Sequence, residues 1–259
     1  MNHENILFER PEKGIRLIIL NRPKVFNTLD SRVMDELDAA IRAVAADRDA
    51  RVLLITSAGK VFSLGADVAG MQDLDAMGAK TLAWRGLRTL RRLERLPVPT
   101  IAVVNGFCLG GGNELAMACD WILASDRAVF GQPEVGLGVI PGWGGTQRLP
   151  RRVGTAMAME MITTGRNVRA KEAKRIGLVN HLYPAEKLMD EAMKTARSMA
   201  AKGPVSIGSS KEAIQCGQHM DLDSACLLEN EISALSFAGA DRKEGMRTFL
   251  ERRGKTVLE

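Results

Sequence analysis

The sequence predicts an α/β protein whose C-terminal part is helical, and three observations support this prediction. Short apolar runs typical of strands alternate with segments of helical period over the first half of the chain. The apolar runs are continuous, so both faces of the sheet should be covered. From about Gly154 onward the sequence is almost wholly helical in character. Strands that alternate with helices pair in parallel through right-handed crossovers, so we expect a parallel sheet.

The first two predicted elements are a strand and a helix. Ile15–Leu20 is an apolar run bounded by Gly14 and by the turn residues 21–23, which predicts a strand. Asp30 or Ser31 can cap the helix that follows. This helix should turn an apolar stripe toward the core, and the stripe consists of Val33, Leu37, Ala40, Ile41 and Val44.

Two further strands flank an arginine-rich helix. Val52–Thr56 and Thr100–Val104 are short apolar runs, and the second ends at the turn signal Asn105-Gly106. Between them, residues 84–97 carry a leucine at every third position with arginines in between, which is typical of an amphipathic helix with one buried face. These leucines are Leu87, Leu90, Leu93 and Leu96.

The remaining elements lead into the helical region. A short helix should begin at about Asn113, and strand-like runs follow it at residues 121–124 and 128–130. A Gly-Pro pair is the best candidate boundary in the helical part. We therefore expect an α/β core over residues 1–202 and a helical C-terminal region over residues 203–259.

Composition excludes several classes of protein. The 259 residues are 46% hydrophobic and 26% charged, which is ordinary for a globular protein and excludes disorder. No apolar run approaches the ~20 residues that a membrane-spanning helix needs. The polar, acidic start resembles neither a signal peptide nor a transit peptide. We therefore expect a soluble, cytoplasmic protein that does not bind membranes.

Cysteine and histidine usage does not indicate a metal centre. The histidines are widely scattered and the cysteines lack CxxC spacing, so we expect no metal site and four reduced, buried thiols. The net charge of +5 is a weak indication of an anionic ligand. No nucleic-acid-binding motif accompanies the arginine-rich helix, so we expect no nucleic-acid partner. The cysteines are Cys108, Cys119, Cys216 and Cys226.

The glycine run Gly110–Gly112 joins the third strand region to the helix at about Asn113. Its spacing does not match the G-x-G-x-x-G of dinucleotide-binding proteins, and the lysine of a phosphate-binding loop is missing. A glycine turn at a helix N-terminus presents backbone N–H groups, which suit an anion or a developing oxyanion. The alternative is a close crossing of strand and helix where only glycine fits.

A second loop and two acids favour the catalytic interpretation. Gly65-Ala66-Asp67 also follows a strand region, and two such loops can each donate one N–H to the same carbonyl oxygen. Glu114 lies about one turn into the short helix, and Glu134 lies in a glycine-rich segment after the next strand. Surface acids are usually just solvated. In apolar surroundings, however, burial raises the pKa of at least one carboxyl of a pair, so that one can donate a proton and the other accept one.

Five stretches of the chain, in this order, occur in one known superfamily: LNRPKVFNTLD (20–30), VFSLGADVAGM (61–71), VNGFCLGGGNELAMACD (104–120), FGQPEVGLGVIPGWGGTQRLPRRVG (130–154) and DRKEGMRTFLERR (241–253). They resemble the crotonase superfamily of acyl-coenzyme A enzymes, and within it enoyl-CoA hydratase. Together they span nearly the whole chain. The presence of both glutamates is what points to hydratases.

The resemblance implies a role for each residue of the site. The N–H groups of Ala66 and Gly111 would form the oxyanion hole and hold the thioester carbonyl oxygen. Glu114 would activate the water that attacks the β-carbon, and Glu134 would deliver a proton to the α-carbon. The residues that would bind the substrate are Lys24, Ala66, Asp67, Val68, Gly111 and Gly142.

The resemblance also implies a fold, an assembly and a substrate class. The fold would be a spiral of ββα turns, and the helical C-terminal region would form trimers, commonly paired into hexamers. The substrate would be an acyl-CoA thioester, so coenzyme A would enter as part of the substrate and no separate cofactor would be needed. Ala69 and Gly70 stand where hydratases often have a lysine, which leaves the contacts to the phosphates of coenzyme A open.

Two groups of alternatives remain at this point. The chain could be another acyl-CoA enzyme of the superfamily: an isomerase, a thioester hydrolase, a decarboxylase or a specialised hydratase. It could also be a non-catalytic, RNA-binding relative that uses its basic face. Isomerases of this superfamily typically lack an acid at the position of Glu114, and disrupted glutamates would favour the RNA-binding interpretation.

Overall fold

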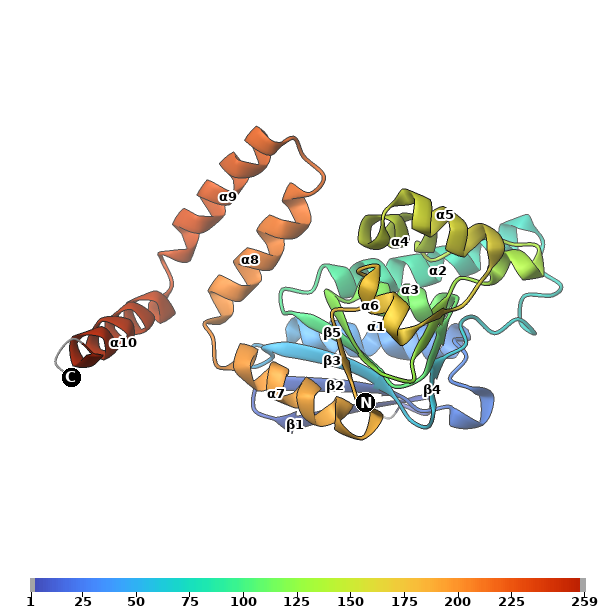
Figure 1. Ribbon diagram of the computed structural model, residues 1–259, viewed down its shortest axis with the longest axis horizontal. Coiled ribbons are helices and arrows are strands. Elements are labelled where there is room, and N and C mark those ends of the chain that lie inside the picture. Colours follow the sequence, from blue (N-terminus) through green and yellow to red (C-terminus); the bar gives the residue numbers. More distant parts are fainter. Residues whose placement is uncertain (1–2, 257–259) are drawn as a thin grey trace.

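Two β-sheets form the centre of the computed structural model, which describes residues 3–256 (Figure 1). The larger sheet contains, in spatial order, β1 (Ile6–Glu12), β2 (Ile15–Leu20), β3 (Val52–Ser57), β5 (Thr100–Val104), β7 (Trp121–Ser125) and β10 (His181–Tyr183). The smaller sheet contains β4 (Val61–Ser63), β6 (Phe107–Leu109), β8 (Val129–Gly131) and β9 (Val168–Arg169).

Helices follow the strands along the whole described chain. They are α1 (Ser31–Ala46), α2 (Ala76–Glu94), α3 (Gly111–Ala118), α4 (Gly145–Val153), α5 (Thr155–Thr164), α6 (Ala170–Arg175), α7 (Leu188–Ala200), α8 (Pro204–Gly217), α9 (Leu222–Ser236) and α10 (Ala240–Thr256). Three single turns of 3₁₀ helix are η1 (Pro23–Val25), η2 (Glu134–Leu137) and η3 (Ala185–Lys187). The prediction of an α/β protein with a helical C-terminal region is confirmed.

The chain winds as a spiral of ββα turns. In each turn one strand joins the larger sheet, the next joins the smaller sheet, and a helix leads to the following turn: β3-β4-α2, then β5-β6-α3, then β7-β8-η2-α4. Neighbouring strands β2, β3, β5 and β7 pair in parallel, as predicted. The spiral expected from the resemblance is therefore confirmed.

The continuous apolar strands pack against two hydrophobic cores, one on each face of the larger sheet. Alternate residues of β2, such as Ile18 and Leu20, pack into a core that includes α1, α2 and α3. Their neighbours Ile15 and Leu17 pack into a second core with α7. Because side chains alternate across a strand, a strand that is covered on both faces is apolar at nearly every position.

Helix α1 begins where the sequence predicts. The side chain of Asp30 accepts a hydrogen bond from the N–H of Val33 (2.9 Å), and the whole predicted stripe is buried. Helix α2 begins at Ala76, eight residues before the predicted arginine-rich segment, and buries Leu90 and Leu93 as predicted. Leu87 of the same row is only half-buried.

Several strands were not predicted, and the reason is their length or position. Strands β4, β6 and β9 have two or three residues, too few for a periodic pattern. Strand β1 pairs antiparallel with β2 at the sheet edge and carries exposed polar residues. The prediction that the chain is almost wholly helical after Gly154 is wrong at β9 and β10, which complete the two sheets.

The prediction of four buried cysteines is half right. Cys108 and Cys119 are buried in the core, whereas Cys216 and Cys226 are exposed. The exposed pair lies on α8 and α9, neither of which buries a residue in the protomer. No helix within residues 3–256 is long and apolar enough to cross a membrane.

The three C-terminal helices extend away from the sheets, at the left of Figure 1. Helix α8 begins at Pro204, directly after the predicted boundary. Its Lys211 forms an ion pair with Asp120 (2.8 Å), and its Gln215 donates to the carbonyl of Glu94 (2.8 Å). The division at residue 203 stays a prediction, and residues 1, 2 and 257–259 of the two predicted regions lie outside the described residues.

Close packing at Gly106 gives a stability prediction. A Cβ at this position would collide with the backbone carbonyl oxygen of Lys60. We expect Gly106→Ala to lower the free energy of unfolding by about 1–3 kcal/mol in urea titrations, because backbone cannot yield as a flexible side chain can. The control is Gly245→Ala in α10, where a Cβ would meet nothing within 4 Å. Equal stability of the two variants would contradict the prediction.

Candidate active site

Two backbone N–H groups lie close together where successive turns of the spiral meet. A Cβ on Gly65 would lie 2.9 Å from the nitrogen of Gly111, and a Cβ on Gly111 would lie 3.3 Å from the nitrogen of Ala66. Gly111 is the first residue of α3, so its N–H has no acceptor inside the helix. Neither it nor the N–H of Ala66 donates a hydrogen bond within residues 3–256. This is the arrangement that an oxyanion hole requires.

Local hydrogen bonds hold the first of these loops in place. The N–H of Leu29 donates to the carbonyl of Gly65 (2.8 Å), and the hydroxyl of Ser63 donates to the carbonyl of Asn27 (2.8 Å). Gly65 has a φ of +97°, a conformation that L side chains rarely adopt. These contacts leave the N–H of the next residue, Ala66, free to face Gly111.

The second loop is shaped by Gly110, which precedes α3. Its φ of +51° and ψ of −128° turn the chain from β6 into the helix. Its N–H donates to the carbonyl of Gly131 in β8 (3.0 Å), and its carbonyl accepts the N–H of Glu114 (3.0 Å). The N-terminus of α3 therefore points at the site with the positive end of its dipole.

Glu114 is a buried carboxyl held by backbone donors. Its side chain is almost fully buried, and its Oε1 accepts hydrogen bonds from the N–H groups of Trp143 (2.8 Å) and Gly145 (2.6 Å). Burial raises the pKa of Glu114, while the two N–H donors and the charge of Arg148 act in the opposite direction. The donors stabilise the ionised form, so this carboxyl is suited to accept a proton.

Glu134 has a different environment in the same place. It begins η2 and is half-buried, and a Cβ on Gly110 would lie 3.2 Å from its Oε1. Its Oε2 is buried without a hydrogen-bond partner. Burial raises the pKa of Glu134 to about 7, its own backbone N–H acts against this rise, and the charge of Glu114 adds to it.

The amide of Gln132 also contacts Glu134. Its nitrogen is best placed facing the carbonyls of Gly110 and Gly131, both at 3.1 Å. The amide oxygen then faces Oε1 of Glu134 at 3.3 Å. Two oxygens at this distance form a hydrogen bond only if one carries a proton, so the contact suits a neutral Glu134 that can donate.

The other predicted binding residues lie around this centre at different distances. Asp67 and Val68 continue the loop after Ala66, and Val68 is exposed. Gly142 is exposed beside Trp143, and a Cβ there would lie 3.6 Å from the Cβ of Ala83 in α2. Lys24 is exposed in η1. The residues that follow η1 form backbone hydrogen bonds with the loop at Gly65. No contact joins the side chain of Lys24 to the two acids within the described part of the chain.

Sequence reasoning missed the groups that hold Glu114. The N–H donors of Trp143 and Gly145 come from a glycine-rich segment whose loop character was recognised but whose partner was not. Trp143 also fills the space beside Gly111, since a Cβ there would lie 2.5 Å from its indole ring.

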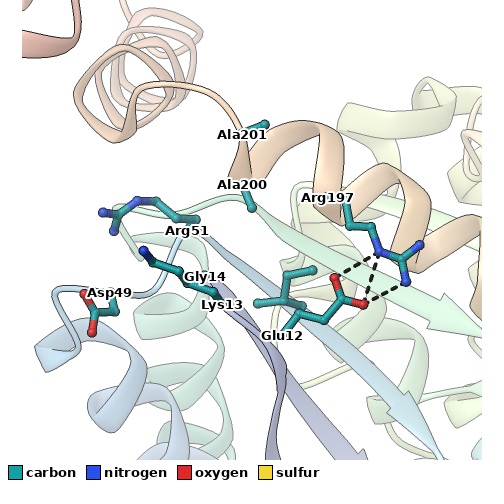
Figure 2. A pocket seen from close by; sticks show the side chains of 9 residues that line it. Glu12, Lys13, Gly14, Asp49, Arg51, Arg197, Ala200 and Ala201 are labelled. Carbon is teal, nitrogen blue, oxygen red and sulfur yellow. Dashed lines mark hydrogen bonds and ion pairs between the residues drawn. The ribbon is translucent and has the colours of Figure 1, made fainter.

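A groove elsewhere on the surface contains none of these residues. It has a volume of about 450 Å³ and lies where β2 and β3 begin and α7 ends, far along the chain from the glycine loops. Figure 2 shows two of its lining residues, Arg197 and Glu12, pointing toward each other, and they form an ion pair at 2.7 Å. In α/β sheets ligands bind beyond the carboxyl ends of strands, whereas this groove lies at their amino ends.

Comparison with known proteins decides the family. Residues 10–257 match the family described as "Enoyl-CoA hydratase/isomerase". The chain belongs to this family. It is 46% identical to a crotonyl-CoA hydratase of Syntrophomonas wolfei and 42% identical to a short-chain-enoyl-CoA hydratase of Clostridium acetobutylicum, each over 98% of this chain and 97% of the relative.

Solved structures show the same membership in three dimensions. An enoyl-CoA hydratase from Bacillus anthracis superposes with a TM-score of 0.93 at 35% identity, over 96% of this chain and 97% of that one. The likeness in fold covers nearly the whole chain. Within residues 3–256, no group of three or more His, Cys, Asp or Glu side chains could hold a metal ion.

The raised pKa of Glu134 predicts a trade-off between function and stability. Its pKa rises from the usual 4.5 to about 7 on folding, so the stability that its protonation contributes is present below pH 4.5 and lost as pH rises through 7. We expect Glu134→Gln to stabilise the protein at pH 8 by about 1–2 kcal/mol, after allowance for partial exposure, and little at pH 4.5. Thermal unfolding at the two pH values measures the difference.

The control is Glu212→Gln on the exposed face of α8. This substitution should change stability equally at both pH values. A Glu134→Gln variant that behaves like this control would show that Glu134 is ionised and solvated.

Proposed function

We propose that this family member is an enoyl-CoA hydratase that adds water across the 2,3 double bond of a 2-enoyl-CoA to give a 3-hydroxyacyl-CoA. The observation that carries the proposal is a pair of unpartnered backbone N–H groups near a buried and a half-buried carboxyl that differ in their hydrogen bonds. The names of the most similar relatives agree with this reaction. The reaction is the hydration step of fatty-acid β-oxidation.

In this proposal the N–H groups of Ala66 and Gly111 hold the thioester carbonyl oxygen. Addition of water to a conjugated thioester moves negative charge onto that oxygen, so donors aimed at it stabilise the transition state more than the substrate. The N-terminus of α3 adds its dipole. One such donor is worth a factor of ~10²–10³ in rate.

The two acids divide the proton transfers between them. Glu114, held by two N–H donors, takes a proton from water as the water oxygen bonds to the β-carbon. Glu134, neutral below about pH 7, gives its proton to the α-carbon as the enolate collapses. One water is added, and the two carboxyls together end with the proton count with which they began.

The competing reactions of this family do not need both carboxyls in the roles proposed here. A double-bond isomerase needs one carboxyl to carry a proton from one carbon to another, and it leaves a buried Glu114 without a task. A thioester hydrolase needs an attack on the carbonyl carbon itself. The second carboxyl, held by two dedicated backbone donors, therefore favours hydration.

Coenzyme A enters as part of the substrate, and the reaction uses no other cofactor. Lys24, Asp67, Val68 and Gly142 are the residues proposed to contact the acyl-CoA thioester, since they surround the oxyanion loops or follow them in sequence. A short enoyl-CoA such as crotonyl-CoA suits the site as a test substrate. We place this activity in the cytoplasm, without nucleic-acid or membrane partners.

We also propose that the C-terminal helices form a homotrimer, which can pair into a hexamer. Helices α8 and α9 pack on each other yet bury no residue within the protomer. They and α10 expose many large apolar side chains, a pattern that marks an interaction surface. These side chains are Val205, Ile214, Met220, Leu222, Leu227, Leu235, Phe237, Met246, Phe249 and Leu250.

The two-acid mechanism predicts the kinetics of two variants. We expect Glu114→Gln and Glu134→Gln each to lower kcat for hydration of crotonyl-CoA by about 10²–10⁴, because each removes one proton transfer. KM should change little, since neither acid holds coenzyme A. Loss of the conjugated-enoyl absorbance measures the rate, with Glu212→Gln as the matched control. Full turnover by either site variant would contradict the assignment.

The assembly predicts a native mass. Light scattering on the purified protein should give three or six times the protomer mass of 28.2 kDa. Leu227→Glu on α9 should shift the mass downward, because it places a charge in the proposed apolar interface. A monomeric wild-type protein would contradict the proposed assembly.

A further inference from the structure

Arg148 is a buried cation beside the site that the mechanism does not use. It lies on α4, is 9% exposed, and contacts two acceptors. Its Nε donates to Oε1 of Glu94 (2.5 Å), and its Nη1 donates to the carbonyl of Trp143. A buried guanidinium is stable only when paired in this way, so the position is built for an arginine.

The carbonyl that Arg148 holds belongs to the peptide segment that holds Glu114. Trp143 and Gly145 donate their N–H groups to Glu114, and Gly144 between them has a φ of +108°. A Cβ on Gly144 would collide with the guanidinium of Arg148. Arg148 therefore lies directly against the turn that holds Glu114.

We propose that Arg148 is a positioning residue for Glu114: it anchors the 143–145 turn and places a positive charge near the carboxyl that activates water. This inference rests on the proposed function. Glu94, the last residue of α2, completes the unit by holding Arg148. Because Gln215 of α8 donates to the carbonyl of Glu94 (2.8 Å), the C-terminal helices touch the same unit.

Electrostatics agree with the geometry. The positive charge of Arg148 opposes the rise that burial causes in the pKa of Glu114. The charged groups on the elements around Glu114 are Glu134 on η2, Lys80, Arg85, Arg88, Arg91, Arg92 and Glu94 on α2, and Arg148, Arg151 and Arg152 on α4. Among them only Arg148 both contacts the turn that holds Glu114 and carries a positive charge that acts on its pKa.

The first test compares Arg148→Met with Arg148→Lys in hydration of crotonyl-CoA. We expect Arg148→Met to lower kcat by about 10- to 100-fold with KM nearly unchanged, because Glu114 is misplaced while thioester binding is not. The acid limb of the pH–rate profile should move to higher pH, since a cation near the base is lost. Arg148→Lys, which keeps the charge, should restore the limb and part of kcat.

A double-mutant comparison separates positioning from general damage. In the Glu114→Gln background, Arg148→Met should cause little further loss of kcat, because both changes act through one group. An additive loss in this background, or a folded Arg148→Met protein with wild-type kcat and pH profile, would overturn the proposal.

Two further measurements keep the test independent of folding and of turnover. If Arg148→Met does not fold, Glu94→Gln is tested instead. This variant removes the negative charge that pairs with Arg148, so the acid limb of the pH–rate profile should move to lower pH. An unchanged profile overturns the proposal. Infrared titration of the carboxyl band that Glu114→Gln removes reports the pKa of Glu114 without substrate. Wild-type protein inactive on crotonyl-CoA would defeat the proposed function, while an unshifted infrared titration in Arg148→Met would defeat this inference.

Discussion

The close approach of two backbone segments, at Gly65-Ala66 and Gly110-Gly111, is the constraint on which the rest of the site depends. A side chain at Gly111 would strike the indole of Trp143, and one at Gly112 would lie 2.7 Å from the Cβ and the carbonyl oxygen of Ser63. Removing the Cβ atoms lets the loops of successive spiral turns touch. Only then do the backbone nitrogens of Ala66 and Gly111 come close together, at the residue where α3 begins.

The two carboxyls show how one small volume can hold an acid and a base. Both are desolvated, which by itself would leave both protonated. Two backbone N–H groups from the 143–145 turn donate to Glu114, whereas Glu134 keeps an oxygen without a partner. The difference in hydrogen bonding is what sets the two carboxyls apart. Two neighbouring carboxyls of like charge titrate as a pair, so the pKa of each one depends on whether the other is protonated.

The same region connects the site to the C-terminal helices. Glu94 ends α2, its side chain holds Arg148, and its carbonyl is held by Gln215 of α8. Asp120, just beyond α3, pairs with Lys211 of α8 at 2.8 Å. The helices proposed to assemble the oligomer are therefore attached to the elements that place Glu114, and assembly and catalysis share a structural support.

The sequence by itself determined the long elements and the chemical identity of the site. Strands such as Ile15–Leu20 and Thr100–Val104 were predictable because burial on two faces requires an unbroken apolar run, and the glycine loops and both acids were visible as residue types. Tertiary structure alone decided the second sheet, the exposure of Cys216 and Cys226, and the partners of Glu114. Strands of three residues carry no period, and a backbone N–H looks the same at every residue. Which N–H meets which carboxyl depends on contacts between distant turns of the spiral, and these exist only once the chain has folded.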